Sequence, residues 1–292
     1  MRSFVPRYEL VMPQNLGDAL ALIAREPGKW KPFAGGTDLM VLFEAGKLSH
    51  TTFCNISDLP ELKGIRVLPN SVEIGALTTY TDIAQHAEIQ REFSLLCQAA
   101  LVTGAVAIQN RGTIGGNIVN ASPAADTPPA LLAYDAQAVL VSARGERTVA
   151  YAHFHQSYKE MDIRPDELLK TIVLPRRPGT FHQYYRKVGT RKAQAISKVC
   201  LAAVARMEKK ILAEIRIGIA SVAPVPFRVR RTETFLIGKT LSPIVIAEAK
   251  TIVGQEISPI DDIRSTAAYR RRVTENLLEE FLCGIGSPNS KS

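Results

Sequence analysis

Residues 111–126 read RGTIGGNIVNASPAAD, which is the most informative stretch of the chain. Glycines, small side chains and hydroxyls suit a backbone packed against a flat or phosphorylated ligand. Asn117, Asn120, Ser122 and Asp126 can add side-chain hydrogen bonds. Residues 105–126 are expected to form one long irregular segment, and a bland loop of this length is unusual inside a compact domain. We therefore interpret it as part of a ligand site.

A second glycine pair lies upstream, in Phe33-Ala34-Gly35-Gly36-Thr37-Asp38-Leu39, and predicts a strand, a tight turn and a helix start. Glycines let the backbone approach a pyrophosphate, and a helix N-terminus offers N–H groups and a positive dipole. A plain turn capped by Thr37 fits these residues equally well. The pattern is not G-x-G-x-x-G, the next strand (52–56) does not end in an acidic residue, and the Walker lysine is absent.

Two such segments in one chain favour a large dinucleotide that bridges two subdomains, although the residues alone do not identify it. Around them, Asn15 is a good N-cap for the first helix, and residues 175–179, PRRPG, are the best domain boundary. The patterns predict further strands at 65–68, 72–76, 137–142, 147–151, 181–188, 198–207 and 211–222, and further helices at 81–87, 92–103, 229–237, 243–254 and 266–283.

The composition is that of an ordinary globular protein, with 292 residues of which 46% are hydrophobic and 22% charged. This length predicts two or three compact units. No apolar run reaches the roughly 18 residues that span a bilayer. Pro6 and Glu9 interrupt the N-terminus where a secretory signal would be apolar. We expect a cytoplasmic protein with no membrane segment.

The formal net charge of +8 raises the question of nucleic-acid binding. The basic residues are spread out, and the densest stretches, Arg228–Arg231 and Arg270–Arg272, have no interleaved aromatics. We expect these stretches to form a solvated or subunit-facing surface and expect no nucleic-acid partner.

No catalytic residue and no metal site is predicted. The four cysteines contain no C-x-x-C pair, so we expect four buried thiols and no Zn or Fe–S site held by this chain. His153 and His155 share one face of a possible strand, but no third ligand accompanies them. No Ser-His-Asp set or carboxylate pair stands out.

Three stretches, FAGGTDLM (33–40), RGTIGGNIVNASPAAD (111–126) and YYRKVGTRKAQAIS (184–197), closely resemble the FAD-binding middle subunit of the xanthine dehydrogenase and carbon monoxide dehydrogenase family of molybdenum hydroxylases. The similarity runs essentially end to end. It implies an α+β chain with the FAD-binding fold of the vanillyl-alcohol oxidase or p-cresol methylhydroxylase type, followed by a C-terminal three-stranded antiparallel sheet with helices. The implied units are residues 1–56, 57–176 and 177–292.

The resemblance also implies which residues bind FAD. The first loop on the diphosphate would comprise Pro32, Phe33, Ala34, Gly35, Gly36, Thr37, Asp38 and Leu39. The second would comprise Thr113, Ile114, Gly115, Gly116 and Asn117. Asp126 would reach the ribityl and adenosine region, Leu168 would pack near it, and Lys187 would open a loop beside the isoalloxazine.

In the family that the chain resembles, the middle subunit does not hydroxylate the substrate. A molybdenum-cofactor subunit does so, a 2Fe-2S subunit passes electrons to FAD, and the flavin reduces NAD or another acceptor. Two alternatives are a self-contained flavin oxidase, which usually needs a longer chain with its own substrate pocket, and a basic dinucleotide or nucleic-acid binder without redox function. The substrate and the acceptor (NAD, oxygen, a quinone or a ferredoxin) stay open.

Overall fold

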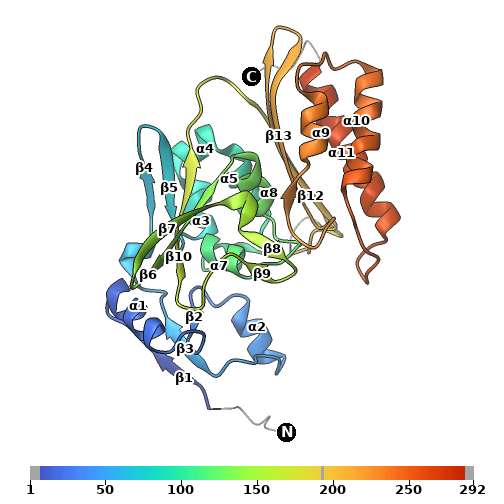
Figure 1. Cartoon of the computed structure of the whole chain (residues 1–292). Coiled ribbons are helices and arrows are strands. Elements are labelled where there is room, and N and C mark those ends of the chain that lie inside the picture. Colours follow the sequence, from blue (N-terminus) through green and yellow to red (C-terminus); the bar gives the residue numbers. More distant parts are fainter. Residues whose placement is uncertain (1–6, 192–193, 287–292) are drawn as a thin grey trace.

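The computed structural model describes residues 7–191 and 194–286, and the chain is α+β (Figure 1). Its strands form three main sheets that follow one another along the sequence, together with the small pair β8 (His155–Ser157) and β9 (Glu160–Met161). Within these described ranges, no helix is both long and apolar enough to cross a membrane.

The first sheet is small and parallel, with the order β1-β3-β2. Its elements are β1 (Glu9–Val11), α1 (Leu16–Arg25), β2 (Lys31–Phe33), α2 (Leu39–Glu44) and β3 (Thr52–Asn55). The predicted cap of the first helix is confirmed, because the Asn15 side chain accepts a hydrogen bond from the Asp18 N–H at 2.9 Å. The helix α1 buries its apolar face, Ala19, Leu20 and Ile23.

The second sheet is antiparallel, with the order β4-β5-β10-β6-β7. Its strands are β4 (Ile65–Val67), β5 (Ser71–Gly75), β6 (Gln137–Ser142), β7 (Gly145–Ala150) and β10 (Leu168–Pro175). The helices of this region are η1 (Pro60–Leu62), α3 (Tyr80–Gln85), α4 (Ala87–Glu92), α5 (Ser94–Val102), α6 (Val106–Gln109), α7 (Ile114–Val119), α8 (Pro128–Ala133) and η2 (Tyr151–His153).

Two of these helices, α6 and α7, lie within residues 105–126, where the sequence predicted an irregular segment. The prediction was wrong because the glycines in this stretch do not break the helix. Gly115 and Gly116 occupy the first turn of α7, and the missing side chain of Gly115 lets this turn pack against Ala76.

The third sheet is antiparallel and has four strands rather than the expected three. The strands are β11 (His182–Val188), β12 (Val199–Glu208), β13 (Ile211–Ala220) and β14 (Phe227–Arg228). The missed strand β14 is only two residues long, and it pairs with Ile219 and Gly218 of β13. Three helices follow: α9 (Arg230–Leu236), α10 (Pro243–Glu256) and α11 (Ala267–Gly286).

The third sheet is covered on both faces, by α9, α10 and α11 on one side and by α8 on the other (Figure 1). Side chains alternate along a strand, so β12 supplies two cores. Val199, Leu201 and Ala203 join the core beneath the last three helices. Cys200 and Ala202 join the core of the central sheet. The third sheet therefore completes the core of the second.

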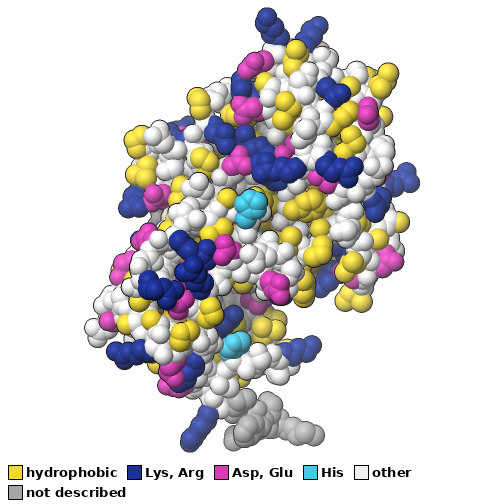
Figure 2. All heavy atoms as spheres, in the orientation of Figure 1, with side chains coloured by type: hydrophobic (Ala, Val, Ile, Leu, Met, Phe, Trp, Pro, Cys, Tyr) yellow, Lys and Arg dark blue, Asp and Glu magenta, His cyan; other side chains and the backbone are white. Residues whose placement is uncertain are grey.

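The prediction of a solvated surface holds for part of the basic stretches, since Arg230, Arg231 and Arg272 are exposed. Lys and Arg side chains are interspersed with acidic ones over the face shown in Figure 2. Two arginines from the densest stretches, Arg228 and Arg270, are instead buried. Arg228 is paired with Glu233 at 2.6 Å and Arg270 with Asp262 at 2.7 Å. The sequence could not show that these two arginines are buried, because a buried arginine needs a carboxylate partner and that partner is known only once the fold is known.

Candidate functional site

The two glycine segments lie against each other. A Cβ on Gly35 would lie 1.9 Å from the carbonyl oxygen of Arg111, so the two backbones approach more closely than a side chain would permit. On the same side, Asn120 donates to the Asp38 carboxylate at 3.3 Å. The fold thus brings together two segments that the sequence singled out independently.

The first segment is a loop that runs from the end of β2 to the start of α2. Gly36 has a φ of +74°, which favours glycine. In the described contacts of this loop, the four consecutive N–H groups from Gly35 to Asp38 have no acceptor in the protein. Asp38, not Thr37, occupies the N-cap position of α2, and it makes no side-chain cap. A row of unpaired N–H groups is suited to an anion such as a phosphate.

The second segment uses its backbone for packing. Thr113 caps α7 by accepting the Gly116 N–H at 3.1 Å. The N–H groups of Ile114 and Gly115 donate to residues after β5, to Thr78 at 3.0 Å and to Ala76 at 2.8 Å. The N–H groups of Ile114, Gly115 and Gly116 are therefore satisfied within the protein.

Gly115 and Gly116 have different surroundings although they are neighbours. A Cβ on Gly115 would lie 2.7 Å from both the Cβ and the carbonyl oxygen of Ala76. A Cβ on Gly116 would meet only the Thr113 hydroxyl, at 3.0 Å. Gly115 is therefore needed for packing, whereas Gly116 leaves an open surface. Next to it, Asn117 accepts a hydrogen bond from the hydroxyl of Thr127.

A pocket of about 320 Å³ lies where the two segments meet. Sequence reasoning missed most of its lining, because those residues come from the turns before and after β4 and β5. One signal was available: Thr79 and Asp82 form a capping box at the start of α3, with the T-x-x-D spacing visible in the sequence. The lining residues are Ala34, Gly35, Ser57, Asp58, Lys63, Gly64, Leu77, Thr78, Thr79, Asp82, Asn110, Arg111 and Thr113.

Asp126 and Lys187 form a buried ion pair at 2.6 Å. The Ser197 hydroxyl donates to the same carboxylate at 2.6 Å, and the Tyr185 hydroxyl donates to the Asp126 carbonyl at 3.1 Å. Burial raises the pKa of the Asp126 carboxyl, and Lys187 and Ser197 oppose that shift. Lys187 also donates to the carbonyl of Val102 at 3.0 Å. The charge of Lys187 is therefore balanced by the Asp126 carboxylate, and this ion pair joins β11 to the segment before α8.

The remaining predicted residues line or support the first loop. Pro32 and Phe33 are in β2. The Phe33 ring lies against Gly36, where an added Cβ would be 2.8 Å from Phe33 Cζ. Leu39 begins α2. Leu168 begins β10 and is buried in a small core, against which Ala34 packs.

Within the part of the chain that the structure describes, no group of three His, Cys, Asp or Glu residues could hold a metal ion. Cys54, Cys97 and Cys200 are buried, and burial raises the pKa of the Cys97 thiol to about 11. Cys283 is exposed, which corrects the expectation of four buried thiols. Among the described residues, the candidate site therefore consists of the loop after β2, the pocket and the buried ion pair.

Comparison with known proteins agrees with this geometry. Residues 6–177 match the family described as FAD binding domain in molybdopterin dehydrogenase. Residues 183–284 match the family described as CO dehydrogenase flavoprotein C-terminal domain. Together the two matches span both the glycine segments and the third sheet.

Individual relatives align along almost the whole chain. The glyceraldehyde dehydrogenase medium chain of Sulfolobus acidocaldarius is 31% identical, over 94% of this chain and 96% of its own length. The xanthine dehydrogenase FAD-binding subunit of Escherichia coli O157:H7 is 29% identical, over 93% and 95%. A structure of carbon monoxide dehydrogenase from Hydrogenophaga pseudoflava superposes with a TM-score of 0.91 at 27% identity, covering 95% of this chain and 96% of that one. The chain therefore belongs to the FAD-binding subunits of the molybdopterin dehydrogenases, a family of oxidoreductases that includes the carbon monoxide and xanthine dehydrogenases.

Proposed function

We propose that this chain is the electron-transfer subunit of a molybdenum hydroxylase complex. It would take electrons from a 2Fe-2S partner subunit and pass them to NAD or another acceptor, while a molybdenum-cofactor subunit oxidises the substrate. The observation that carries the proposal is the loop from Gly35 to Asp38, whose unpaired N–H groups lie beside the second glycine segment. Relatives named as a medium chain and as an FAD-binding subunit support the place of this chain in a complex.

FAD fits the residues present. The loop Pro32–Leu39 would hold the diphosphate through its backbone, since four N–H groups there have no acceptor in the described contacts. Residues Thr113–Asn117 would form the opposite wall, with Gly116 giving close access. Asp126 and Lys187 would lie further along the cofactor, and Leu168 would support it from the core. When bound, FAD supplies the redox chemistry of the subunit.

The rest of the proposal concerns architecture and location. We assign residues 1–56 and 57–176 to the two subdomains of a vanillyl-alcohol oxidase or p-cresol methylhydroxylase type of flavin fold, and residues 177–292 to a C-terminal domain. The order of the three sheets along the chain supports this division. We place the complex in the cytoplasm.

The experiment compares the chain expressed alone with the chain co-expressed with the products of its neighbouring genes. Alone, it should show flavin absorbance near one FAD per chain and slow NADH oxidation with an artificial dye. It should not hydroxylate purines, aldehydes or N-heterocycles, whereas the complex should hydroxylate one of them. Hydroxylation by the single chain, free of molybdenum and iron, would overturn the relay and favour a self-contained flavin oxidase.

A further inference from the structure

Helix α8 is the joint between the central sheet and the third sheet. All six of its residues, Pro128–Ala133, are buried. A Cβ on Gly218 of β13 would lie 2.3 Å from the carbonyl oxygen of Pro129, so helix and strand touch backbone to backbone. A short helix held this closely moves as one body, because packed interiors do not deform smoothly.

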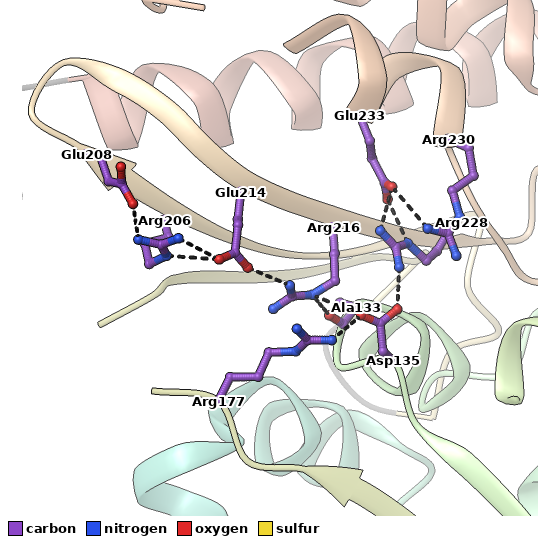
Figure 3. A network of polar contacts seen from close by, with 10 residues as sticks. All are labelled: Ala133, Asp135, Arg177, Arg206, Glu208, Glu214, Arg216, Arg228, Arg230 and Glu233. Atoms are coloured by element: carbon purple, nitrogen blue, oxygen red, sulfur yellow. Dashed lines mark hydrogen bonds and ion pairs between the residues drawn. The ribbon is translucent and has the colours of Figure 1, made fainter. Parts of the chain in front are cut away.

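Each end of α8 carries an acidic residue that binds the third sheet. Before the helix, Asp126 binds Lys187 of β11. After the helix, Asp135 accepts hydrogen bonds from Arg228 of β14 and from Arg177 of the linker, the latter at 2.8 Å, and lies 3.6 Å from Arg216 of β13 (Figure 3).

Asp135 has a particular place in this network. Arg216 also pairs with Glu214, and Arg228 with Glu233, and both of these carboxylates belong to the third sheet and its helices. Asp135 is the carboxylate of Figure 3 that comes from the central region instead. Loss of its charge would leave each buried arginine paired with another carboxylate and would remove the ion pairs that join the C-terminal end of α8 to the third sheet.

We propose that Asp135 is a positioning residue for the flavin site. By binding Arg216 and Arg228 it fixes the register of α8 on the third sheet, and so sets where Asp126 and Lys187 lie. The inference rests on the proposed role of those two residues in holding FAD. The carbonyl of Ala133, which accepts from Arg216 Nε at 2.8 Å, reinforces the same attachment.

The chain offers a conservative variant. Asp135 has a φ of +52°, a conformation that Asn tolerates as readily as Asp. Asp135→Asn therefore keeps the backbone and the shape of the side chain and removes the charge. Glu208→Gln is the matched charge control, since Glu208 pairs with Arg206 at the exposed end of the same network. Leu278→Ala is the stability control, because Leu278 is a fully buried residue of α11 in the core beneath the last three helices, on the face of the third sheet opposite α8.

The experiment measures three quantities on the full chain: the FAD dissociation constant of the apoprotein, the visible circular dichroism of the bound flavin, and the thermal midpoint. Asp135→Asn should weaken FAD binding about tenfold and change the visible spectrum, as expected for coupled residues. Glu208→Gln should change neither. Leu278→Ala should lower the thermal midpoint at least as much as Asp135→Asn does, without affecting the FAD dissociation constant or the visible spectrum.

A second variant keeps the test decisive if Asp135→Asn does not fold. Arg228→Lys retains a charge beside Glu233 but lacks the planar guanidinium whose separate nitrogens contact Glu233 and Asp135, so it should produce the same changes. Unchanged FAD binding and an unchanged spectrum in whichever of these two variants folds overturn the inference. If Asp126→Asn and Lys187→Met also leave FAD binding unchanged, the proposed FAD contacts of Asp126 and Lys187 are wrong. If Asp126→Asn and Lys187→Met weaken FAD binding but the Asp135 and Arg228 variants do not, only the positioning role of Asp135 is wrong.

Discussion

The missing side chain of Gly35 faces the carbonyl oxygen of Arg111, a residue 76 positions further along the chain. This approach closes the candidate site on one side, because it presses the loop after β2 onto the turn before α7. Each of the two glycine segments therefore shapes the other, and changes at the contact should affect both.

Gly35→Ala should lower the FAD content of the purified chain and destabilise it by about 1–3 kcal/mol, since a Cβ only 1.9 Å from a carbonyl oxygen forces one loop to move. The ratio of absorbance at the flavin maximum to that of the protein measures the content. Gly284→Ala is the control, because a Cβ there meets no atom within 4 Å. Full flavin content in Gly35→Ala would contradict the assignment of this loop.

The neighbouring glycines of α7 should respond differently to valine. Gly116→Val should reduce FAD content and leave the stability of the apoprotein nearly unchanged, because its Cβ direction is open apart from the Thr113 hydroxyl. Gly115→Val should destabilise the apoprotein itself by about 2 kcal/mol, through its clash with Ala76. Urea unfolding of both apoproteins separates the two effects. Equal loss of stability in both variants would show that Gly116 is also a packing residue.

Lys187→Met should cost about 3 kcal/mol of stability at neutral pH, because it leaves the Asp126 carboxylate buried without its partner. Burial already raises the pKa of Asp126 above its ordinary value of 3.8. The folded chain therefore binds more protons, and its stability falls as the pH rises from 3.8 through the folded pKa. Without Lys187 that pKa rises further, so the loss should extend to higher pH.

The measurement for this pair is the free energy of unfolding as a function of pH, for Lys187→Met, Asp126→Asn and the double variant. The double variant should regain much of the stability lost in Lys187→Met, since no unpaired charge remains. If the two single losses simply add, the residues do not interact as the 2.6 Å contact indicates.

Glu167→Gln should destabilise the chain by about 1–3 kcal/mol, because Arg147 donates two hydrogen bonds to this buried carboxylate, at 2.7 and 2.8 Å. Arg147 is the main reason that the pKa of Glu167 lies below its ordinary value of 4.5. The corresponding stability is present above pH 4.5 and is lost as the pH falls through the lowered pKa. The thermal midpoint of Glu167→Gln should therefore fall less steeply than that of the unmodified chain as the pH is lowered. Glu146→Gln, which removes the charge of an exposed carboxylate, should show the same pH dependence as the unmodified chain.

The sequence predicted those parts of the fold that depend on local signals. Asn15 marked the start of α1, and the predicted strands 198–207 and 211–222 correspond to β12 and β13. Prediction from the sequence failed where an element depends on a hydrogen-bonding partner that is distant in the sequence. Nothing near Gly115 shows that its N–H will donate to Ala76, a contact that satisfies the first turn of α7 from a distant part of the chain. The two-residue strand β14 forms only because β13 is there to pair with it.

The candidate site divides in the same way. The glycine pairs and the hydrogen-bonding side chain of Asp126 were visible as patterns, and Lys187 was named through the family resemblance. Their pairing needed the fold, since they lie 61 positions apart. Ser197, which completes the cluster, gave no signal of its own, because a single serine after a loop is uninformative until its hydroxyl is found on a buried carboxylate.

The shared core of the second and third sheets has a consequence for how the chain is made. During synthesis the central sheet emerges from the ribosome before β12 does, so the face that Cys200 and Ala202 will cover stays open to solvent until that strand arrives. A nascent chain arrested in the linker 176–181 would expose this apolar face, which is the kind of surface that chaperones bind.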